Sequence, residues 1–369
     1  MSKPERTMRS RYMEWAKTRS QARYNLATSG IINVPMAEFP LRVPDLEITG
    51  GGYGYQPLQQ RLASHNGVPE ECVVAAAGTS MANHLAMAAV LAPGDEVLIE
   101  QPAYGPLLDL AEYLGARIRR ITRAFATDFA LDAGEIELVI TGKTRLIVLT
   151  NLHNPSGALL AAETLQRIGA RAQEVRAYVL VDEVYLEMLF DSAAPFAFRI
   201  GEKLSGENPF IVTSSLTKLY GLSGLRCGWI IAAPELARRI WLLNDLFAAT
   251  APHVSELMSV MAFKNLESFR ERARKLLAAN RPVIDAFLDS RRDLECFRPR
   301  GGTVFFPRLT SGEPEQFLQL LRDKYETTVV PGSFFEMSQH FRIGIGGPTD
   351  ELRVALDRMS EALDEFAKR

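Results

Sequence analysis

Short apolar runs alternating with helix-length spacers are the feature that most constrains the fold of this chain. The run Leu146-Ile-Val-Leu149 is continuously apolar, as expected for a strand covered by helices on both faces of a sheet. Spacers such as residues 82–91 and 164–175 have helical periodicity. Seven strands are expected, at Val73–Ala77, Glu96–Gln101, Ala116–Ile121, Arg145–Thr150, Tyr178–Asp182, Pro209–Ser214 and Cys227–Ala232. The pattern predicts an α/β domain around a mostly parallel sheet.

The pattern changes after about residue 275 and predicts a smaller α+β lobe. Helices are expected at Arg281–Ser290, Glu315–Tyr325 and Glu351–Lys368, and strands at Gly302–Leu309 and Phe341–Ile345. The first 25 residues are basic and also hold Tyr12, Met13 and Trp15, which indicates an amphipathic arm or helix.

Composition narrows the class of protein. A chain of 369 residues can bury a large core and divide into two lobes. The formal net charge of -2 gives no basic field for nucleic acid or an anionic membrane, and no apolar run approaches the length of a membrane span. The cysteines, Cys72, Cys227 and Cys296, are too scattered for a disulfide framework and favour a reducing, cytoplasmic setting. The histidine and cysteine spacings predict no metal site.

A hydroxyl, a lysine and an arginine follow the strand expected to end at Ser214. Ser215 and Lys218 lie three residues apart, and Arg226 follows eight residues later. The arginine and the hydroxyl can bind a phosphate, while the lysine can form a Schiff base with an aldehyde. Pyridoxal phosphate carries both an aldehyde and a phosphate, so this loop suits that cofactor.

Other predicted strands are also followed by polar segments. Asp182-Glu-Val-Tyr185 ends one strand, at the edge where open α/β sheets bind ligands. The turn Asn154-Pro-Ser-Gly157 follows another strand. Gly78-Thr79-Ser80 lies between a third strand and a helix, where amide groups are available to a phosphate. Taken alone, each segment is also explained as a helix cap or an ordinary turn.

Together, in this order, the segments resemble those of the class I and II aminotransferases, the fold type I enzymes that depend on pyridoxal phosphate. The matching segments are GGYGYQP at 51–57, GTS at 78–80, QPAY at 101–104, NPSG at 154–157, DEVY at 182–185, SLTK at 215–218 with Arg226, and FRI at 341–343. The resemblance covers about residues 26–342. It implies a three-layer large domain with a seven-stranded, mostly parallel sheet at 46–275. Residues 1–45 and 276–369 would form a small α+β domain.

The resemblance also implies roles around the cofactor ring. Lys218 would form the Schiff base and then act as general base and acid. Asp182 would keep the pyridine nitrogen protonated, so that the ring accepts electrons. Tyr185 would lie beside the phenolic oxygen, Asn154 would donate a hydrogen bond to that oxygen, and Tyr104 would stack on the ring.

For the cofactor phosphate the resemblance implies one set of residues in the same chain and one tyrosine of a partner subunit. The first set comprises Gly78, Thr79, Ser80, Ser215 and Arg226. In the family a tyrosine of the segment before the first large-domain helix reaches the partner's phosphate. The family's spacing leads here to Thr49, so Tyr53 is the expected substitute and Tyr55 the alternative. A homodimer with shared active sites is therefore expected.

The implied substrates are an amino acid and a 2-oxo acid. Arg342 would bind the α-carboxylate as a forked donor, with Asn154 beside it, and the arm at Gly30 would close over the substrate. No arginine lies between Arg239 and Arg270 to bind a distal carboxylate. We therefore expect neutral or aromatic side chains to be preferred over aspartate.

The expected reaction is reversible transfer of an amino group from the amino acid to the oxo acid. β-Elimination or synthase chemistry remains an alternative, because it shares the same carbanion. Decarboxylation or acyl transfer on this fold is a further alternative. A ligand-sensing regulatory module is a third alternative, but it needs a DNA-binding domain, and only about 45 residues precede the expected large domain.

Overall fold

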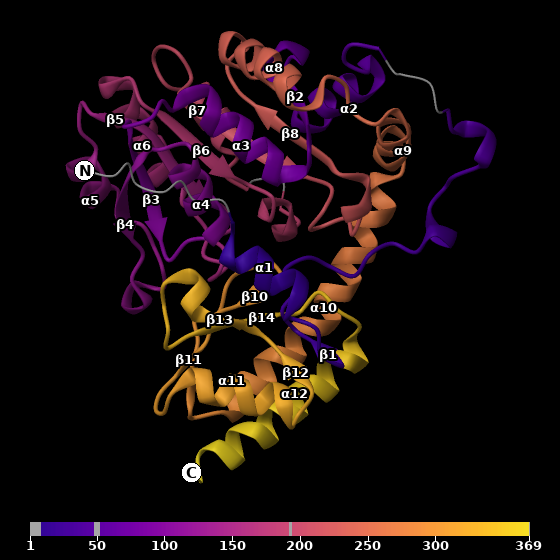
Figure 1. Ribbon diagram of the computed structural model, residues 1–369, viewed down its shortest axis with the longest axis vertical. Helices are drawn as coiled ribbons and strands as arrows, with labels where there is room; N and C mark the ends of the chain where they lie inside the picture. Colours follow the sequence, from indigo (N-terminus) through magenta and orange to yellow (C-terminus); the bar gives the residue numbers. More distant parts are fainter. Residues whose placement is uncertain (1–8, 48–51, 192–193, 369) are drawn as a thin grey trace.

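One seven-stranded sheet forms the centre of the larger lobe (Figure 1). This computed structural model describes residues 9–47, 52–191 and 194–368. The order across the sheet is β2 (Val73–Ala77), β8 (Cys227–Ile231), β7 (Phe210–Ser215), β6 (Tyr178–Asp182), β5 (Thr144–Thr150), β3 (Glu96–Gln101) and β4 (Arg117–Thr122). β8 is antiparallel to both of its neighbours, and the other pairs are parallel. The seven strands expected from the sequence are confirmed, with ends that differ by at most one residue.

Helices cover both faces of this sheet, which explains the continuously apolar strands. On one face, Leu146 and Val148 of β5 pack with residues of α3 (Gly78–Val90), α4 (Gly105–Tyr113) and α8 (Pro234–Ala248). On the other face, Ile147 and Leu149 share a core with α2 (Gln56–Asn66), α6 (Ala162–Val175), α7 (Ala197–Gly201) and α9 (His253–Lys264). α5 (Ala133–Val139) packs against α6. Because successive side chains of a strand point to opposite faces, each face needs its own apolar residues.

The smaller lobe combines the C-terminal third of the chain with the N-terminal arm. β10 (Val304–Phe305), β14 (Phe341–Gly344) and β13 (Val330–Pro331) form a three-stranded antiparallel sheet. β1 (Tyr24–Asn25) of the arm pairs with β12 (Thr327–Thr328), and β9 (Leu294–Glu295) pairs with β11 (Arg308–Leu309). α11 (Pro314–Asp323) and α12 (Thr349–Phe366) pack beside these strands. The lobe is therefore a mixed α+β structure, as expected.

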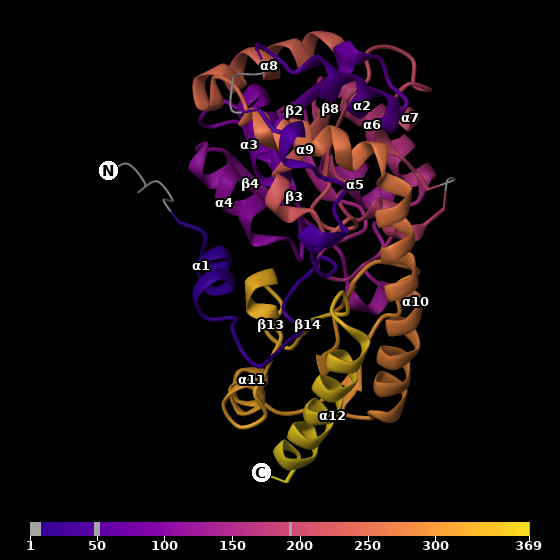
Figure 2. The ribbon, with the colours of Figure 1, turned by 90° about the vertical axis from the view of Figure 1, so that its right-hand side faces the viewer.

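Two long-range features connect the lobes. α10 (Leu266–Ser290) runs along one side of the molecule from the larger lobe to the smaller (Figure 2). α1 (Arg11–Thr18), the amphipathic helix expected in the arm, lies on the opposite side where the lobes meet. The predicted division at residues 45/46 and 275/276 stays a proposal, since α10 crosses its second boundary without a break.

The expectation of one strand at Gly302–Leu309 is wrong. The segment contains two short strands, β10 and β11, which pair with different partners. Pro307 lies between them, and proline has no backbone N–H to donate to a ladder. Short 3₁₀ helices lie at Met36–Glu38, Val43–Asp45, Glu70–Cys72, Phe125–Thr127, Leu186–Leu189, Ser223–Leu225 and Gly332–Phe335.

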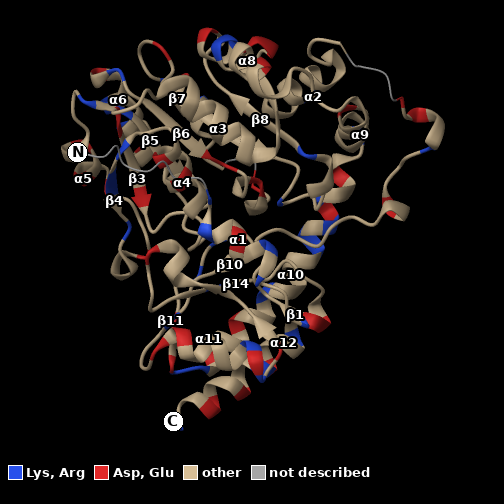
Figure 3. Ribbon diagram, viewed as in Figure 1, with Lys and Arg blue, Asp and Glu red and all other residues tan. Residues whose placement is uncertain are grey.

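Acidic and basic residues are mixed over both lobes (Figure 3), in keeping with the small net charge. Among the described residues, no helix is long and apolar enough to cross a bilayer, and no group of side chains is arranged to hold a metal ion. Cys72 and Cys227 are buried and Cys296 is partly exposed, and all three are free thiols.

Candidate active site

The carboxyl ends of the parallel strands carry most of the predicted site residues. Tyr104 follows β3, Asn154 follows β5, Asp182 ends β6 and Lys218 follows β7. Carboxyl ends of parallel strands meet at one edge of a sheet. The N-terminal arm closes over this edge, and a cavity of about 580 Å³ is lined by Ser29, Tyr104 and Lys218 among other residues.

The Lys218 amine is held by the arm. Its Nζ donates to Ser29 Oγ at 2.9 Å, and the hydroxyl of Tyr185 donates to the same oxygen at 2.8 Å. Burial lowers the pKa of Lys218, which increases the fraction of the nucleophilic, unprotonated amine. Burial raises the pKa of Tyr185 to about 12, so that its phenol remains a donor at neutral pH. Gly30 packs directly on Lys218, since a Cβ built on Gly30 would lie 3.3 Å from the lysine Cα.

Asp182 is a buried carboxyl with two fixed hydrogen bonds. Its Oδ2 accepts from Asn83 Nδ2 at 2.9 Å, and its Oδ1 accepts from the backbone N–H of Val184 at 3.1 Å. Asn83 is oriented in turn by Thr213, whose hydroxyl donates to Asn83 Oδ1 at 2.6 Å. Burial raises the pKa of Asp182 to about 6, against the opposing effects of Asn83, Val184 and Lys218. A cation placed beside this carboxyl would offset that desolvation.

Arg342 is fully buried and faces neutral groups. Its Nη1 donates to Asn154 Oδ1 at 2.8 Å, and its Nη2 donates to the Tyr12 hydroxyl at 3.1 Å and to the Ala27 carbonyl at 2.9 Å. Its Nε is buried without a partner, and no carboxylate of the described residues pairs with it. The bond from Arg342 fixes the amide of Asn154, because only the Oδ1 end can accept. Asn154 Nδ2 donates to no atom of the described residues.

The residues predicted for a phosphate surround the start of α3. Thr79 Oγ1 donates to Ser215 Oγ at 2.8 Å, which joins the two predicted loops, and Ser80 is exposed in the first turn. Arg226 donates to backbone carbonyls at 3.2 Å and pairs with no acid among the described residues. Gly78 has a φ of 77°, and a Cβ there would lie 2.3 Å from Arg226 Nη2. The positive φ favours glycine at this position.

Tyr53 and Tyr55, the predicted cross-subunit residues, both contact other parts of the same subunit. Tyr53 is 63% exposed, and its hydroxyl donates to Asp245 Oδ2 at 2.8 Å. Tyr55 packs edge-on against His253, with ring centroids 4.8 Å apart. Thr49, to which the family spacing leads, lies outside the described residues. The cross-subunit role of Tyr53 stays a prediction.

Two residues in the site were missed by sequence analysis. Asn83 orients Asp182, and the signal available was a pair of adjacent polar side chains, Asn83 and His84, in an otherwise alanine-rich apolar segment. Tyr12 was assigned to the amphipathic arm without a site role. In the structure it bonds Arg342 and packs edge-on against Tyr104, with ring centroids 5.4 Å apart. No local pattern connects residues so far apart in the sequence.

The chemistry of these residues fits pyridoxal phosphate. Arg226 and the amino end of α3 offer positive charge to a phosphate. Lys218 offers an amine with a lowered pKa to an aldehyde, and Asp182 offers a carboxylate to a protonated ring nitrogen. Asn154 keeps a free amide N–H for an oxygen substituent of the ring. Each part of the cofactor has a complementary group.

Comparison with known proteins agrees with this geometry. The family model described as aminotransferase class I and II matches residues 41–359. The chain belongs to this family. Aminotransferases that depend on pyridoxal phosphate predominate among the similar proteins, so the chain is an enzyme of that class.

Relatives within the family carry different activities. The chain is 27% identical to a capreomycidine synthase of Streptomyces vinaceus, over 96% of this chain and 94% of the relative. It is 29% identical to an arginine–pyruvate transaminase of Pseudomonas aeruginosa, over 83% of this chain and 80% of the relative. It is 26% identical to an aspartate aminotransferase of Pyrococcus horikoshii, over 80% of this chain and 76% of the relative.

Solved structures establish the fold. A pyridoxal-phosphate-dependent aminotransferase from Streptococcus suis superposes with a TM-score of 0.90 at 24% identity, covering 98% of this chain and 99% of the other. A pyridoxal-phosphate-dependent cyclase superposes with a TM-score of 0.86 at 21% identity, over the same shares. The fold is therefore that of the fold type I enzymes, as the sequence resemblance implied.

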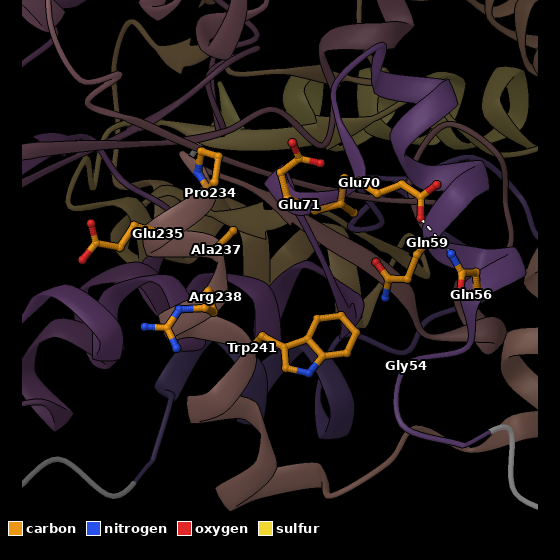
Figure 4. Close-up of a pocket in the computed structure, with 11 residues that line it drawn as sticks. Gly54, Gln56, Gln59, Glu70, Glu71, Pro234, Glu235, Ala237, Arg238 and Trp241 are labelled. Carbon is orange, nitrogen blue, oxygen red and sulfur yellow. Dashed lines mark hydrogen bonds between the residues drawn. The ribbon is translucent and has the colours of Figure 1, made fainter.

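A second cavity lies away from these residues. It measures about 620 Å³ between α2 and α8, and Figure 4 shows Trp241 and Arg238 on one side and Gln56 and Gln59 on the other. Gln56 Nε2 donates to Glu70 Oε2 at 3.3 Å. Of the described residues, none that was predicted to hold cofactor or substrate lines this cavity. The active site is therefore assigned to the cavity that Lys218 lines.

Proposed function

We propose that the protein transfers an amino group from an amino acid to a 2-oxo acid, with pyridoxal phosphate linked to Lys218. The observation that carries this proposal is the fully buried guanidinium of Arg342, which lacks a carboxylate partner among the described residues. Burying an uncompensated charge costs free energy, so a ligand carboxylate is the expected partner. The pair would be forked and charge-assisted.

The proposed roles follow from the contacts. Bound pyridoxal phosphate supplies a sink for electrons released at the substrate α-carbon. Arg342 holds the α-carboxylate and thereby orients the α-carbon toward Lys218. Lys218 Nζ, with its lowered pKa, removes the proton from the substrate α-carbon and would deliver it to the aldehyde-derived carbon of the bound cofactor. Asp182 keeps the ring nitrogen protonated, and Tyr185 and Asn154 donate toward the ring oxygen.

The cavity favours substrates with neutral or apolar side chains. Tyr12, Met13, Trp15 and Ile31 are among its lining residues. Arg23 also lines the cavity, but it is paired with Glu326 at 3.6 Å. A distal carboxylate would have to compete with Glu326 for this arginine. Aspartate should therefore be a poorer donor than neutral or aromatic amino acids.

A second candidate function is cyclisation or elimination at the same site. The capreomycidine synthase matches 96% of this chain, and the pyridoxal-phosphate-dependent cyclase shares its fold over 98% of it, so synthase and cyclase activities occur among similar full-length proteins. Both reactions begin with the same proton removal by Lys218. In amino-group transfer, the amino group of the substrate remains on the cofactor. In cyclisation or elimination, the cofactor keeps its aldehyde form at the end of the reaction.

Absorbance of the purified enzyme with single amino acids tests the proposal. A transaminase half-reaction converts the bound cofactor from its aldehyde to its amine form, so the visible absorbance should be lost and one 2-oxo acid released per site. Aspartate should react more slowly than neutral or aromatic donors. Retention of the absorbance during turnover, with ammonia or a cyclised product, would replace the first function with the second.

The proposed assembly is a homodimer. α8 and the segment before α2 expose Tyr53, Leu242, Leu246 and Phe247, with exposed fractions of 63%, 50%, 80% and 53%. Large apolar side chains gathered on one surface are typical of an interaction site. A second copy is the proposed occupant, because a partner's tyrosine from the segment at Tyr53 is expected to reach the phosphate.

A further inference from the structure

A buried ion pair lies behind the active site. Arg123 Nε is 2.9 Å from Glu100 Oε2, and both side chains are fully buried. Glu100 is the next-to-last residue of β3, near the carboxyl end of that strand, and Arg123 directly follows β4. Arg123 Nη2 is buried without a hydrogen-bond partner among the described residues. Buried ion pairs are weak evidence for stability, since apolar side chains of similar volume often serve as well. The contribution of the Arg123–Glu100 pair to stability therefore does not by itself explain its presence.

The other oxygen of Glu100 holds the turn that carries Asn154. Glu100 Oε1 accepts from Thr150 N at 2.7 Å and from Thr150 Oγ1 at 2.5 Å. The hydroxyl proton of Thr150 is thus committed to Glu100, which leaves its oxygen as an acceptor. That oxygen accepts from the backbone N–H of Asn154 at 3.2 Å. Asn154 Oδ1 in turn accepts from Arg342.

His153 ties the same turn to the loop of Tyr104. Its Nε2 lies 2.9 Å from the Pro102 carbonyl, and its Nδ1 lies 2.6 Å from Ser156 Oγ. Burial lowers the pKa of His153 well below its usual value, so the ring is neutral. A carbonyl only accepts, so Nε2 carries the proton and Nδ1 accepts from Ser156. Pro102 precedes Tyr104 by two residues.

We propose that Glu100 is a positioning residue of the reaction, acting through Thr150 on Asn154. The geometry links the sheet interior to the residue that meets both Arg342 and the cofactor ring oxygen, so this inference rests on the proposed function. Glu100 fixes the backbone of Asn154 through the Thr150 hydroxyl. His153, through its bond to the Pro102 carbonyl, holds the turn of Asn154 at a fixed distance from the loop of Tyr104. Loss of the hydroxyl frees the turn, and the Asn154 amide then donates less well to the ring oxygen.

Thr150→Val tests the link because it removes the hydroxyl and keeps the backbone bond to Glu100. Thr144→Val is the matched control. Thr144 is also buried on β5, its hydroxyl donates to Glu96 of β3 at 2.8 Å, and it accepts from the N–H of Thr141 at 3.1 Å. It lies at the opposite end of the strand from the site. Thr150→Ser keeps a hydroxyl at this position and should therefore behave as the wild type.

Two readouts separate positioning from stability. The first is the pH titration of the visible absorbance of the holoenzyme, whose midpoint should rise by about half a pH unit in Thr150→Val. The second is calorimetric binding of 3-phenylpropionate, which should weaken by about three- to tenfold, the range for one hydrogen bond of about 0.5–1.5 kcal/mol. Thr144→Val and Thr150→Ser should change neither, although Thr144→Val should lower the urea midpoint.

Wild-type values of both readouts in Thr150→Val would overturn the inference, as would equal shifts in Thr144→Val. Wild-type protein that takes up no pyridoxal phosphate would instead overturn the proposed function. The calorimetric comparison does not need the cofactor absorbance, so it would still decide whether Thr150 positions the carboxylate site.

Discussion

Asp182 carries the pH dependence expected of the cofactor-free protein. Its pKa is raised by burial from 3.8 to about 6. A carboxyl with a raised folded pKa contributes stability that is fully present below about pH 3.8 and is lost as the pH rises through about 6. At about 1.4 kcal/mol per pKa unit, the loss is up to about 3 kcal/mol. In urea titrations, the free energy of unfolding of the cofactor-free wild type should therefore fall between pH 4 and 7, relative to that of Asp182→Asn. Parallel pH profiles of the two proteins would contradict this.

Arg342 should govern affinity for all amino-acid substrates together. Arg342→Ala removes a charge-assisted fork worth roughly 1.5–3 kcal/mol, so kcat/KM should fall at least about tenfold for every donor. Arg342→Lys should recover little, because lysine cannot fork. Arg308→Ala, which removes a half-exposed arginine paired with Glu295, is the control and should leave kcat/KM unchanged. Unaltered amino-acid affinity in Arg342→Ala would move the carboxylate site elsewhere.

Among single residues, the sequence predicts the location of those that lie at or next to the ends of strands. Asp182 ends a recognisable buried strand, and Asn154 and Lys218 each follow one, so the sequence motif and the strand end together indicate where these residues lie. Asn83 and Tyr12 were missed because their partners are distant in sequence. Their roles depend on how α3 and the arm dock, which no local pattern encodes.

At the scale of elements, the N-terminal arm should act on the substrate more than on the cofactor. α1 brings the Tyr12 hydroxyl to Arg342 Nη2 at 3.1 Å. Tyr12→Phe keeps the ring packing and removes this acceptor. We expect KM for the amino acid to change about three- to tenfold, with cofactor content unchanged, as judged by steady-state kinetics and absorbance. An unchanged KM together with cofactor loss would assign the arm to cofactor binding instead.

Elements of the larger lobe could be predicted closely, and those of the smaller lobe less so. Most of the central strands are apolar on both faces, so their ends are sharp in the sequence, whereas the edge strand β4 contains three arginines. β9, β10, β11, β12 and β13 have two residues each, too few to give an alternating pattern. Their existence depends on pairing across the lobe, and the single strand expected at Gly302–Leu309 failed for this reason.

At the scale of the whole molecule, the exposed apolar surface of α8 should be covered by a second copy. Leu246→Glu should shift the protein from dimer to monomer in sedimentation velocity and lower its cofactor content. Leu138→Glu is the matched control, because Leu138 is a leucine of α5 that is 85% exposed, against 80% for Leu246. A fully active monomer of the wild type at micromolar concentration would refute the dimer.

Lys218 is proposed to bind the cofactor covalently, and every other role in the site depends on this bond. The most direct measurement is borohydride reduction of the protein with pyridoxal phosphate, followed by proteolysis and mass mapping of the labelled peptide. One label per chain is predicted, on Lys218, and Lys218→Ala should carry none after removal of free cofactor. A stoichiometric label on another lysine, with Lys218 unmodified, would contradict the account.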